Sequence, residues 1–138
     1  MFVLIVGGGK VGAALAQELG DTGHTCRVIE QDPARVEHLA EDHPALDVLR
    51  GDGCEPVVLE SGRITQADAV AAVTGHDEDN LVVCLLAKRE YSVRVTVARI
   101  NDPRNEWLFT EMFGVDHTVS STRMMAHILD EHLEGTSA

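Results

Sequence analysis

Basic residues are scarce in this sequence: 11 lysines and arginines stand against 23 aspartates and glutamates, which gives a formal net charge of −12. Such a surplus of negative charge opposes attraction to nucleic-acid phosphates and to anionic membrane surfaces. We therefore expect no nucleic-acid partner. The sequence also lacks a run of about 20 apolar residues, the length that a membrane-spanning helix needs. Its apolar start has no basic segment before it, so we expect no signal peptide.

Paired metal and redox motifs are missing as well. The three cysteines, Cys26, Cys54 and Cys84, form no C-x-x-C pair, and this pattern favours unpaired thiols in a reduced cytosolic compartment. The seven histidines form neither H-x-x-x-H nor H-E-x-x-H, the spacings with which one helix presents two histidines to zinc. We therefore predict no metal site.

Short apolar runs alternate with segments of helical periodicity along the chain, a pattern typical of a parallel sheet with helices on both faces. The length corresponds to one domain, which we place over residues 1–138. The predicted strands are 2–6, 25–30, 47–50, 68–74, 93–100 and 117–120. Six strands with five intervening helical segments predict the α/β class, as a Rossmann-type doubly wound parallel sheet of order 3-2-1-4-5-6.

Helix starts and apolar stripes complete this prediction. Asp32 followed by Pro33 is typical of a helix N-cap and its first residue. Pro103 predicts another helix start, and we expect the apolar residues after it to point inward: Trp107, Leu108 and Met112. A last helix is predicted from about residue 122 to 133. It carries apolar residues at helical spacing, which either pack on the chain's own sheet or form an interface: Met125, Ile128, Leu129 and Leu133.

The glycine loop after the first predicted strand is the strongest chemical signal. Gly7, Gly9 and Gly12 match G-x-G-x-x-G between a strand and a helix. Gly7 permits a tight turn, Gly9 lets a pyrophosphate approach the backbone, and Gly12 lets helix and strand pack closely. Phosphates would then meet the amides at the helix start, near Lys10 and Val11. The alternative is a glycine-rich turn without a ligand.

An acidic residue stands where a dinucleotide fold requires one. Glu30 ends the second predicted strand, and its carboxylate is suited to accept hydrogen bonds from the ribose hydroxyls of an adenosine. It would repel a 2′-phosphate, and no basic residue follows it directly in Gln31 and Asp32. These residues predict NAD(H) rather than NADP(H). The alternative for Glu30 alone is a solvated strand end.

Beyond this fingerprint, most of the chain resembles the N-terminal nucleotide-binding domain of Trk-type potassium-uptake regulators, also called the RCK, KTN or TrkA-N domain. The resemblance rests on these segments: residues 4–12, 28–32, 51–53, 72–74, 77–81, 98–103 and 114–116. The first two are shared with all Rossmann domains, whereas Gly-Asp-Gly, Thr…Asp-Glu-x-Asn-Leu and Ala-Arg-Ile-Asn are specific together. The chain departs from the family at Lys10, where arginine is common, and at Ser120-Ser121, where a proline is common.

The later motifs add candidate ligand contacts. Asp52 and Gly53 follow the third predicted strand, where Asp52 is placed to accept from an adenine amine or to form an Asx turn between two glycines. Thr74 ends the fourth strand and offers a hydroxyl to a ribose or phosphate. The resemblance implies that Asn80 is a contact for the ligand. We interpret the acidic run that begins at Asp77 as charge complementary to a helix dipole.

Arg99 ends the fifth predicted strand at the same edge of the sheet. Its guanidinium is suited to bridge phosphate oxygens of a ligand or a carboxylate of a neighbouring subunit. The alternative is a salt bridge to a surface acid of its own chain.

The resemblance implies a regulatory subunit or domain that binds NAD(H), or ATP, ADP or AMP in the same site, and gates a membrane potassium transporter. It further implies a homodimer or a larger ring, on the cytoplasmic side of the membrane through the transporter. The alternatives are a fragment of an NAD-dependent oxidoreductase and a binding domain of another regulator. We predict no enzyme and no catalytic residue, because the chain carries no substrate domain after the sixth strand and His76 has no evident orienting partner. Family members often add a second ligand-binding lobe, which these residues do not include.

Overall fold

The computed structural model describes residues 1–134, and within them the predicted Rossmann-type sheet is confirmed. Six parallel strands pair in the order β3-β2-β1-β4-β5-β6. The elements are β1 (Phe2–Val6), α1 (Lys10–Asp21), β2 (Thr25–Glu30), α2 (Pro33–Asp42), β3 (Asp47–Arg50), α3 (Pro56–Ser61), η1 (Ile64–Gln66), β4 (Ala69–Ala72), α4 (Asp77–Arg89), β5 (Val95–Arg99), η2 (Pro103–Leu108), η3 (Glu111–Phe113), β6 (His117–Val119) and α5 (Ser121–Glu134). The order of the strands reverses between β1 and β4, so that the crevice for a ligand is expected there.

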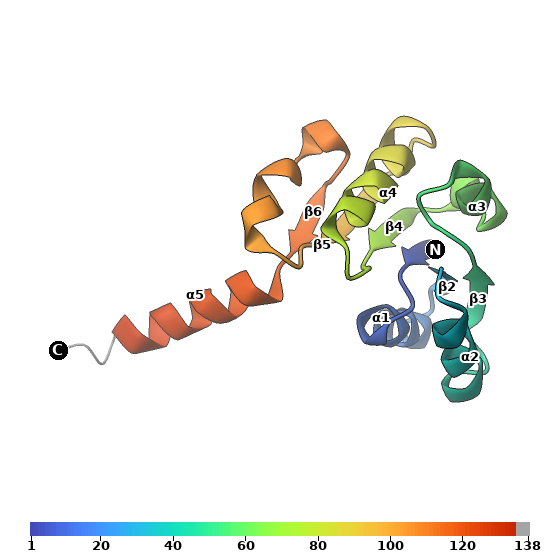
Figure 1. Ribbon diagram of the computed structural model, residues 1–138, viewed down its shortest axis with the longest axis horizontal. Coiled ribbons are helices and arrows are strands. Elements are labelled where there is room, and N and C mark those ends of the chain that lie inside the picture. Colours follow the sequence, from blue (N-terminus) through green and yellow to red (C-terminus); the bar gives the residue numbers. More distant parts are fainter. Residues whose placement is uncertain (135–138) are drawn as a thin grey trace.

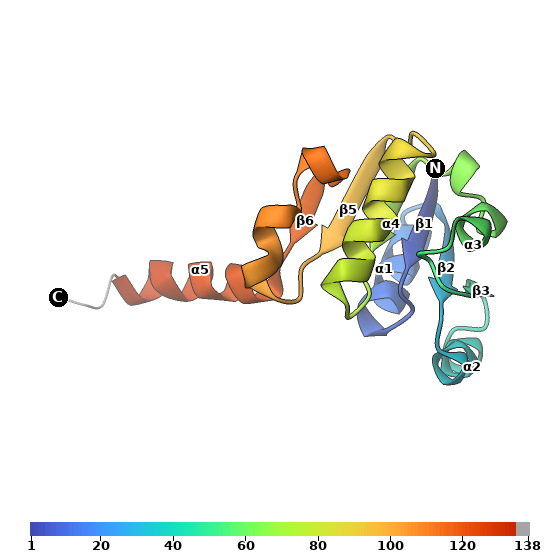
Figure 2. The same cartoon turned by 45° about the horizontal axis from the view of Figure 1, so that its top comes forward.

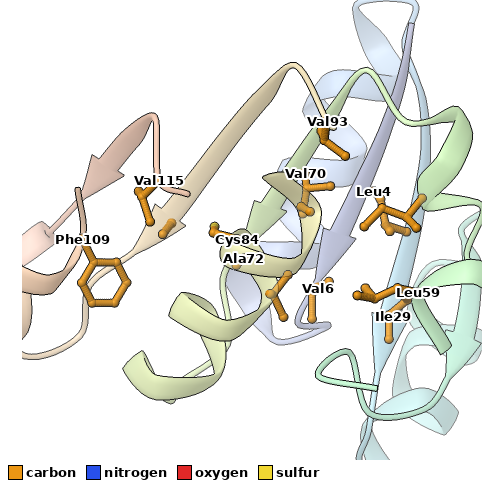
Figure 3. Packing of buried hydrophobic residues seen from close by; sticks show 14 of the residues in the cluster. Leu4, Val6, Ile29, Leu59, Val70, Ala72, Cys84, Val93, Phe109 and Val115 are labelled. Carbon is orange, nitrogen blue, oxygen red and sulfur yellow. The ribbon is translucent and has the colours of Figure 1, made fainter. Parts of the chain in front are cut away.

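The central strands carry buried residues on both faces of the sheet, since successive side chains point to opposite faces and helices cover each face. On β1, Leu4 and Val6 belong to the larger cluster, which α3, α4 and the segment after β5 cover (Figure 3). Ile5 points to the opposite face, where it packs with Val28 of β2 and Ala16 of α1. All three residues of β1 named here are at most 3% exposed.

The start of α2 agrees with its predicted N-cap. Asp32 accepts a 3.0 Å hydrogen bond from the amide of Ala34, and Pro33 is the first helical residue. This cap fixes where β2 ends and α2 begins, and so it places Glu30 at the edge of the sheet.

The segment after β5 differs from its prediction. It forms the two short 3₁₀ helices η2 and η3, and Trp107 and Met112 are 73% and 72% exposed rather than buried. A 3₁₀ helix has three residues per turn, so the inward positions differ from those of an α-helix. Phe109 and Val115, which flank η3, fill the core instead, and Leu108 packs against them in part.

Helix α5 extends away from the body of the domain (Figures 1 and 2). Every residue from Ser121 to Leu133 is exposed. An ion pair of 2.6 Å between Arg123 and Glu106 ties the first turn of α5 to η2. Of the two alternatives for its apolar stripe, packing on the chain's own sheet is therefore wrong. Within residues 1–134, no helix has the length and apolar character to cross a bilayer.

Candidate functional site

A cavity of about 700 Å³ opens at the carboxyl edge of the sheet, across the point where the strand order reverses. Its size falls within the range of small-molecule sites, roughly 300 to 1,000 Å³. Most of the residues predicted as ligand contacts meet on its wall: Gly7, Gly9, Lys10, Glu30, Gln31, Asp52, Gly53, Thr74 and Arg99. Three predicted contacts do not line it: Val11, Gly12 and Asn80.

Steric constraints differ among the three glycines of the fingerprint. Gly7 has φ +116°, and a Cβ there would lie 2.9 Å from the amide nitrogen of Thr74. A Cβ on Gly12 would lie 1.8 Å from the carbonyl oxygen of Gly7, so Gly12 serves the packing of α1 on the loop rather than the cavity. A Cβ on Gly9 would meet no atom of residues 1–134 within 4 Å. The fold itself therefore does not require glycine at Gly9, whereas a ligand approaching the backbone would.

The amino end of α1 begins at this loop. Gly9 is its N-cap, no side chain caps it, and its first turn has no acidic residue. The first helical hydrogen bond is donated by Ala13 to the carbonyl of Gly9. The amides before Ala13, among them those of Lys10 and Val11, thus have no intrahelical acceptor, and the helix dipole adds a partial positive charge. This arrangement suits a phosphate.

Glu30 is only 5% exposed and stabilises the loop that it faces. One carboxylate oxygen accepts from the amide of Gly8 and the other from the amide of Asp32, both at 2.8 Å. The oxygen that accepts from Asp32 keeps a second lone pair, which leaves capacity for a ribose hydroxyl, whereas the other oxygen is also 3.5 Å from Arg35. Glu30 is therefore not a solvated strand end.

Arg35 is a residue of the site that the sequence analysis missed. Its guanidinium lies 3.5 Å from a carboxylate oxygen of Glu30 and lines the cavity. It lies in the first turn of α2 rather than directly after β2, the position at which a basic residue would signal NADP(H). The helical start at Pro33 was the signal that would have placed Arg35 next to Glu30.

The loop after β3 takes the Asx-turn alternative. One oxygen of Asp52 accepts a 2.9 Å hydrogen bond from the amide of Cys54. A Cβ on Gly53 would lie 2.4 Å from a methyl carbon of Val6, so glycine lets this loop cover the end of β1. Burial, helped by the negative charges of Asp79 and Asp52, raises the pKa of the Cys54 thiol to about 12. The thiol stays protonated at neutral pH and is no nucleophile.

Asn80, predicted as a ligand contact, does not line the cavity and makes its hydrogen bonds within the protein. Its side chain is fully buried. Its oxygen accepts from the amide and the hydroxyl of Thr74, at 3.0 and 2.7 Å, and its nitrogen donates to the carbonyls of Thr74 and Arg99, at 3.1 and 2.9 Å. Asn80 therefore joins the ends of β4 and β5, and the hydroxyl of Thr74 is already engaged within the protein.

Asp77 has a larger role than the charge complementarity expected of it. Its carboxylate is 6% exposed and accepts four hydrogen bonds. The donors are the amide and side chain of Asn101, the amide of Asp102 and the side chain of Asn105, at 2.6 to 3.0 Å. Burial by itself raises the pKa of Asp77, but these donors outweigh it and hold the pKa below its ordinary value. Asp77 thus fastens α4 to the loop that leads into η2.

Lys10 and Arg99 bring positive charge to the cavity. Arg99 ends β5 on its wall, and within residues 1–134 its guanidinium pairs with no carboxylate, so the surface salt bridge considered for it does not form. Glu30, Asp32 and Asp52 line the part of the wall formed by β2 and β3. The wall thus carries charges of both signs, since Arg35 lies beside Glu30 and Asp79 of α4 also lines the cavity.

Comparison with known proteins gives consistent matches. The TrkA-N domain family matches residues 3–121. The Trk system potassium uptake protein TrkA of Mycobacterium tuberculosis is 44% identical over 133 residues, which cover 95% of this chain and 59% of that protein. The chain therefore spans about three fifths of the length of this relative.

Solved structures agree with the fold. The TrkA-N domain of the inner membrane protein ybaL from Escherichia coli superposes with a TM-score of 0.83 at 21% identity, and the match covers 96% of each chain. The GsuK channel bound to NAD gives a TM-score of 0.80 at 27% identity, over 98% of this chain and 23% of the channel chain. The expected resemblance is thus confirmed by sequence and by structure.

Proposed function

Because the chain belongs to the TrkA-N domain family, we propose that it binds NAD(H) in the cavity of about 700 Å³ and thereby regulates a membrane potassium transporter. The observation that carries this proposal is the combination at one cavity of an open approach to Gly9, an uncapped helix start and the carboxylate of Glu30.

In this proposal the parts of the cavity take different parts of the ligand. The pyrophosphate lies against Gly9 and the amides that begin α1, with the charge of Lys10 beside it. The adenosine ribose lies at Glu30, and the adenine extends over Asp52 and Gly53. Arg99 approaches from the other side of the crevice to contact phosphate. Gln31 completes the ribose end of the wall.

ATP, ADP and AMP are alternative ligands of the same cavity. The GsuK channel has been solved with NAD and with ADP, and the ADP form is 27% identical to this chain with a TM-score of 0.80. The glycine loop, the uncapped helix start and Glu30 would serve all of these nucleotides, because they contact the ribose and phosphates that the nucleotides share. Native mass spectrometry of the nucleotide that co-purifies distinguishes them.

We propose that the domain binds without transferring a hydride. His76 is the one imidazole among the lining residues, and within residues 1–134 its ring has no orienting partner. Sustained oxidation of NADH with small carbonyl substrates, in proportion to protein concentration, would instead support the oxidoreductase alternative.

The proposed assembly is a homodimer, or a ring of dimers, held through α5 at the cytoplasmic face of the membrane. Met125, Ile128 and Leu129 of α5 are 59%, 48% and 58% exposed. A monomer rarely leaves such a stripe in water. Light scattering at micromolar concentration should show a dimer for the wild type and a monomer for Ile128→Asp/Leu129→Asp. A monomeric wild type would contradict this assembly.

The regulatory part of the proposal is tested by potassium flux through a co-expressed transporter. A ligand shifts the equilibrium between two conformations of the regulatory assembly only to the extent that it binds them with different affinity. We expect flux to respond to NADH with the wild type and to lose this response with Gly9→Val. A response that persists in Gly9→Val would place the sensing elsewhere.

A further inference from the structure

A second cavity lies on the other side of the glycine loop, between α1 and α2. It measures about 490 Å³. Gly9, Lys10 and Arg35 line both cavities, so these residues form the wall between them. The nucleotide of the proposed function does not require this second space, because the ribose and pyrophosphate contacts named above lie in the first.

The charge of the second cavity is opposite to that of the chain. Acids outnumber lysines and arginines by 23 to 11 in the sequence. Around this cavity, however, two fixed cations, Lys10 and Arg35, and two imidazoles, His38 and His43, face a single carboxylate, that of Asp42. A focused positive potential in a concave site raises the local concentration of anions.

These basic groups are available to a ligand. Within residues 1–134, the side chains of Lys10, His38 and His43 have no hydrogen-bond or ion-pair partner. Arg35 is 52% exposed and contacts Glu30 at the long distance of 3.5 Å through one terminal nitrogen, which leaves other N–H donors of its guanidinium. The wall also includes the backbone of Gly9, directly before the uncapped amides of α1.

We propose that this second cavity binds a phosphate monoester group, beside the nucleotide and in contact with Arg35, His38 and His43. The planar guanidinium matches two phosphate oxygens, and the imidazoles supply further N–H donors. The phosphate is either that of a separate small molecule or the terminal phosphate of a triphosphate seated in the first cavity across Lys10.

The test observes the seven histidine side chains by two-dimensional NMR of the full chain during titration with inorganic phosphate, against sodium chloride at equal ionic strength. We expect saturable shifts at His38 and His43, while His24 and His117, which lie outside both cavities, serve as internal controls. If inorganic phosphate has no effect but ATP shifts both histidines and AMP does not, the source is the terminal phosphate. Equal shifts in chloride, or no selective shift with any of these, would overturn the proposal.

Single variants separate this site from the nucleotide site. His38→Gln should weaken the phosphate response of His43 about tenfold, the loss expected for one charge-assisted hydrogen bond. His117→Gln on β6 is the matched control and should leave it unchanged. NADH affinity should be the same in both variants, since His38 does not line the first cavity. Failure of NADH binding in the wild type would refute the proposed function and leave the phosphate result to be judged alone.

Discussion

The side-chain amide of Asn80 donates a hydrogen bond of 2.9 Å to the backbone carbonyl of Arg99, and so links the first turn of α4 to the end of β5. The side-chain oxygen of Asn80 also accepts hydrogen bonds from the amide and hydroxyl of Thr74, and its nitrogen donates a second one to the carbonyl of Thr74. The ends of β4 and β5, which border the first cavity, therefore depend on a residue that does not line that cavity.

We predict that Asn80→Ala destabilises the domain and weakens nucleotide binding. It removes the hydrogen-bond partners of the amide of Thr74 and the carbonyl of Arg99, both half-buried, at a cost of about 1–3 kcal/mol for each group left unsatisfied. The carbonyl of Thr74 keeps the side-chain donor of Asn101. Urea unfolding should show the loss, and calorimetry should show weaker NADH binding. Gln17→Ala, on the exposed face of α1, is the control. Unchanged stability in Asn80→Ala would show that water replaces the lost partners.

The carboxylate of Asp77 predicts a pH-dependent stability. Its pKa is held below the ordinary value of 3.8, so in the unfolded chain this group takes up a proton first as the pH falls. The stability that it contributes is present above the unfolded pKa and is lost as the pH falls through the folded pKa. Asp77→Asn should cost about 2 kcal/mol at pH 7, the scale of a hydrogen-bonded charged group.

The difference between wild type and Asp77→Asn should shrink below the ordinary Asp pKa of 3.8, because the wild-type carboxyl becomes neutral too. Thermal unfolding of both proteins across acidic to neutral pH measures it. Asp68→Asn is a comparison, since Asp68 accepts only one hydrogen bond given by the structure, from the amide of Phe2. A difference that is constant with pH would mean that the charge of Asp77 is not what stabilises the loop.

Arg99 is predicted to recognise phosphate. Arg99→Ala should weaken ADP or ATP more than adenosine, by about tenfold to a hundredfold for one charged contact of roughly 1.5–3 kcal/mol. Arg104→Ala removes a well-exposed arginine outside the cavity, and it should change neither the affinity for ADP or ATP nor the affinity for adenosine. Equal losses for ATP and adenosine in Arg99→Ala would assign Arg99 to folding instead of recognition.

Glu30 and Arg35 are predicted to set the choice between NADH and NADPH in opposite directions. Glu30 repels a 2′-phosphate, so the wild type should bind NADH more tightly than NADPH. Glu30→Gln keeps the shape of the side chain and should narrow this difference in affinity. Arg35 partly neutralises Glu30 at 3.5 Å, so Arg35→Ala should widen it. Titration calorimetry with both cofactors measures the ratio. Tighter NADPH binding by the wild type would contradict the role of Glu30.

The sequence was most informative where a residue's role depends on its immediate neighbours. The sheet order and the loop geometry of Gly7 and Gly12 followed from strand-loop-helix spacing, and the N-cap Asp32 from the proline after it. The roles of Asp77 and Asn80 could not be predicted in this way, because they depend on distant partners: Asp77 binds the loop at Asn101, and Asn80 joins the nearby Thr74 to Arg99, 19 residues away.

The prediction for the segment around Trp107 was wrong for a different reason. Its apolar residues fit a helical period, but no local signal distinguished a 3₁₀ helix from an α-helix, and the two place different residues inward. The ion pair of Arg123 and Glu106 joins the first turn of α5 to η2, the element that carries the outward Trp107. The sequence of one chain does not show what covers an apolar helix stripe. It therefore left open whether α5 packs on its own sheet or forms an interface.

The most direct test of the central proposal is the calorimetric affinity for NADH of the wild type, Gly9→Val and Gly20→Val. A Cβ at either glycine would meet no atom of residues 1–134 within 4 Å, so both variants should fold, but only Gly9 lines the cavity. We predict that NADH binds the wild type and Gly20→Val alike, and Gly9→Val at least about tenfold more weakly, a difference of roughly 1.4 kcal/mol. Equal affinity in all three proteins, or no binding to the wild type, would contradict the proposal that the glycine loop holds the dinucleotide.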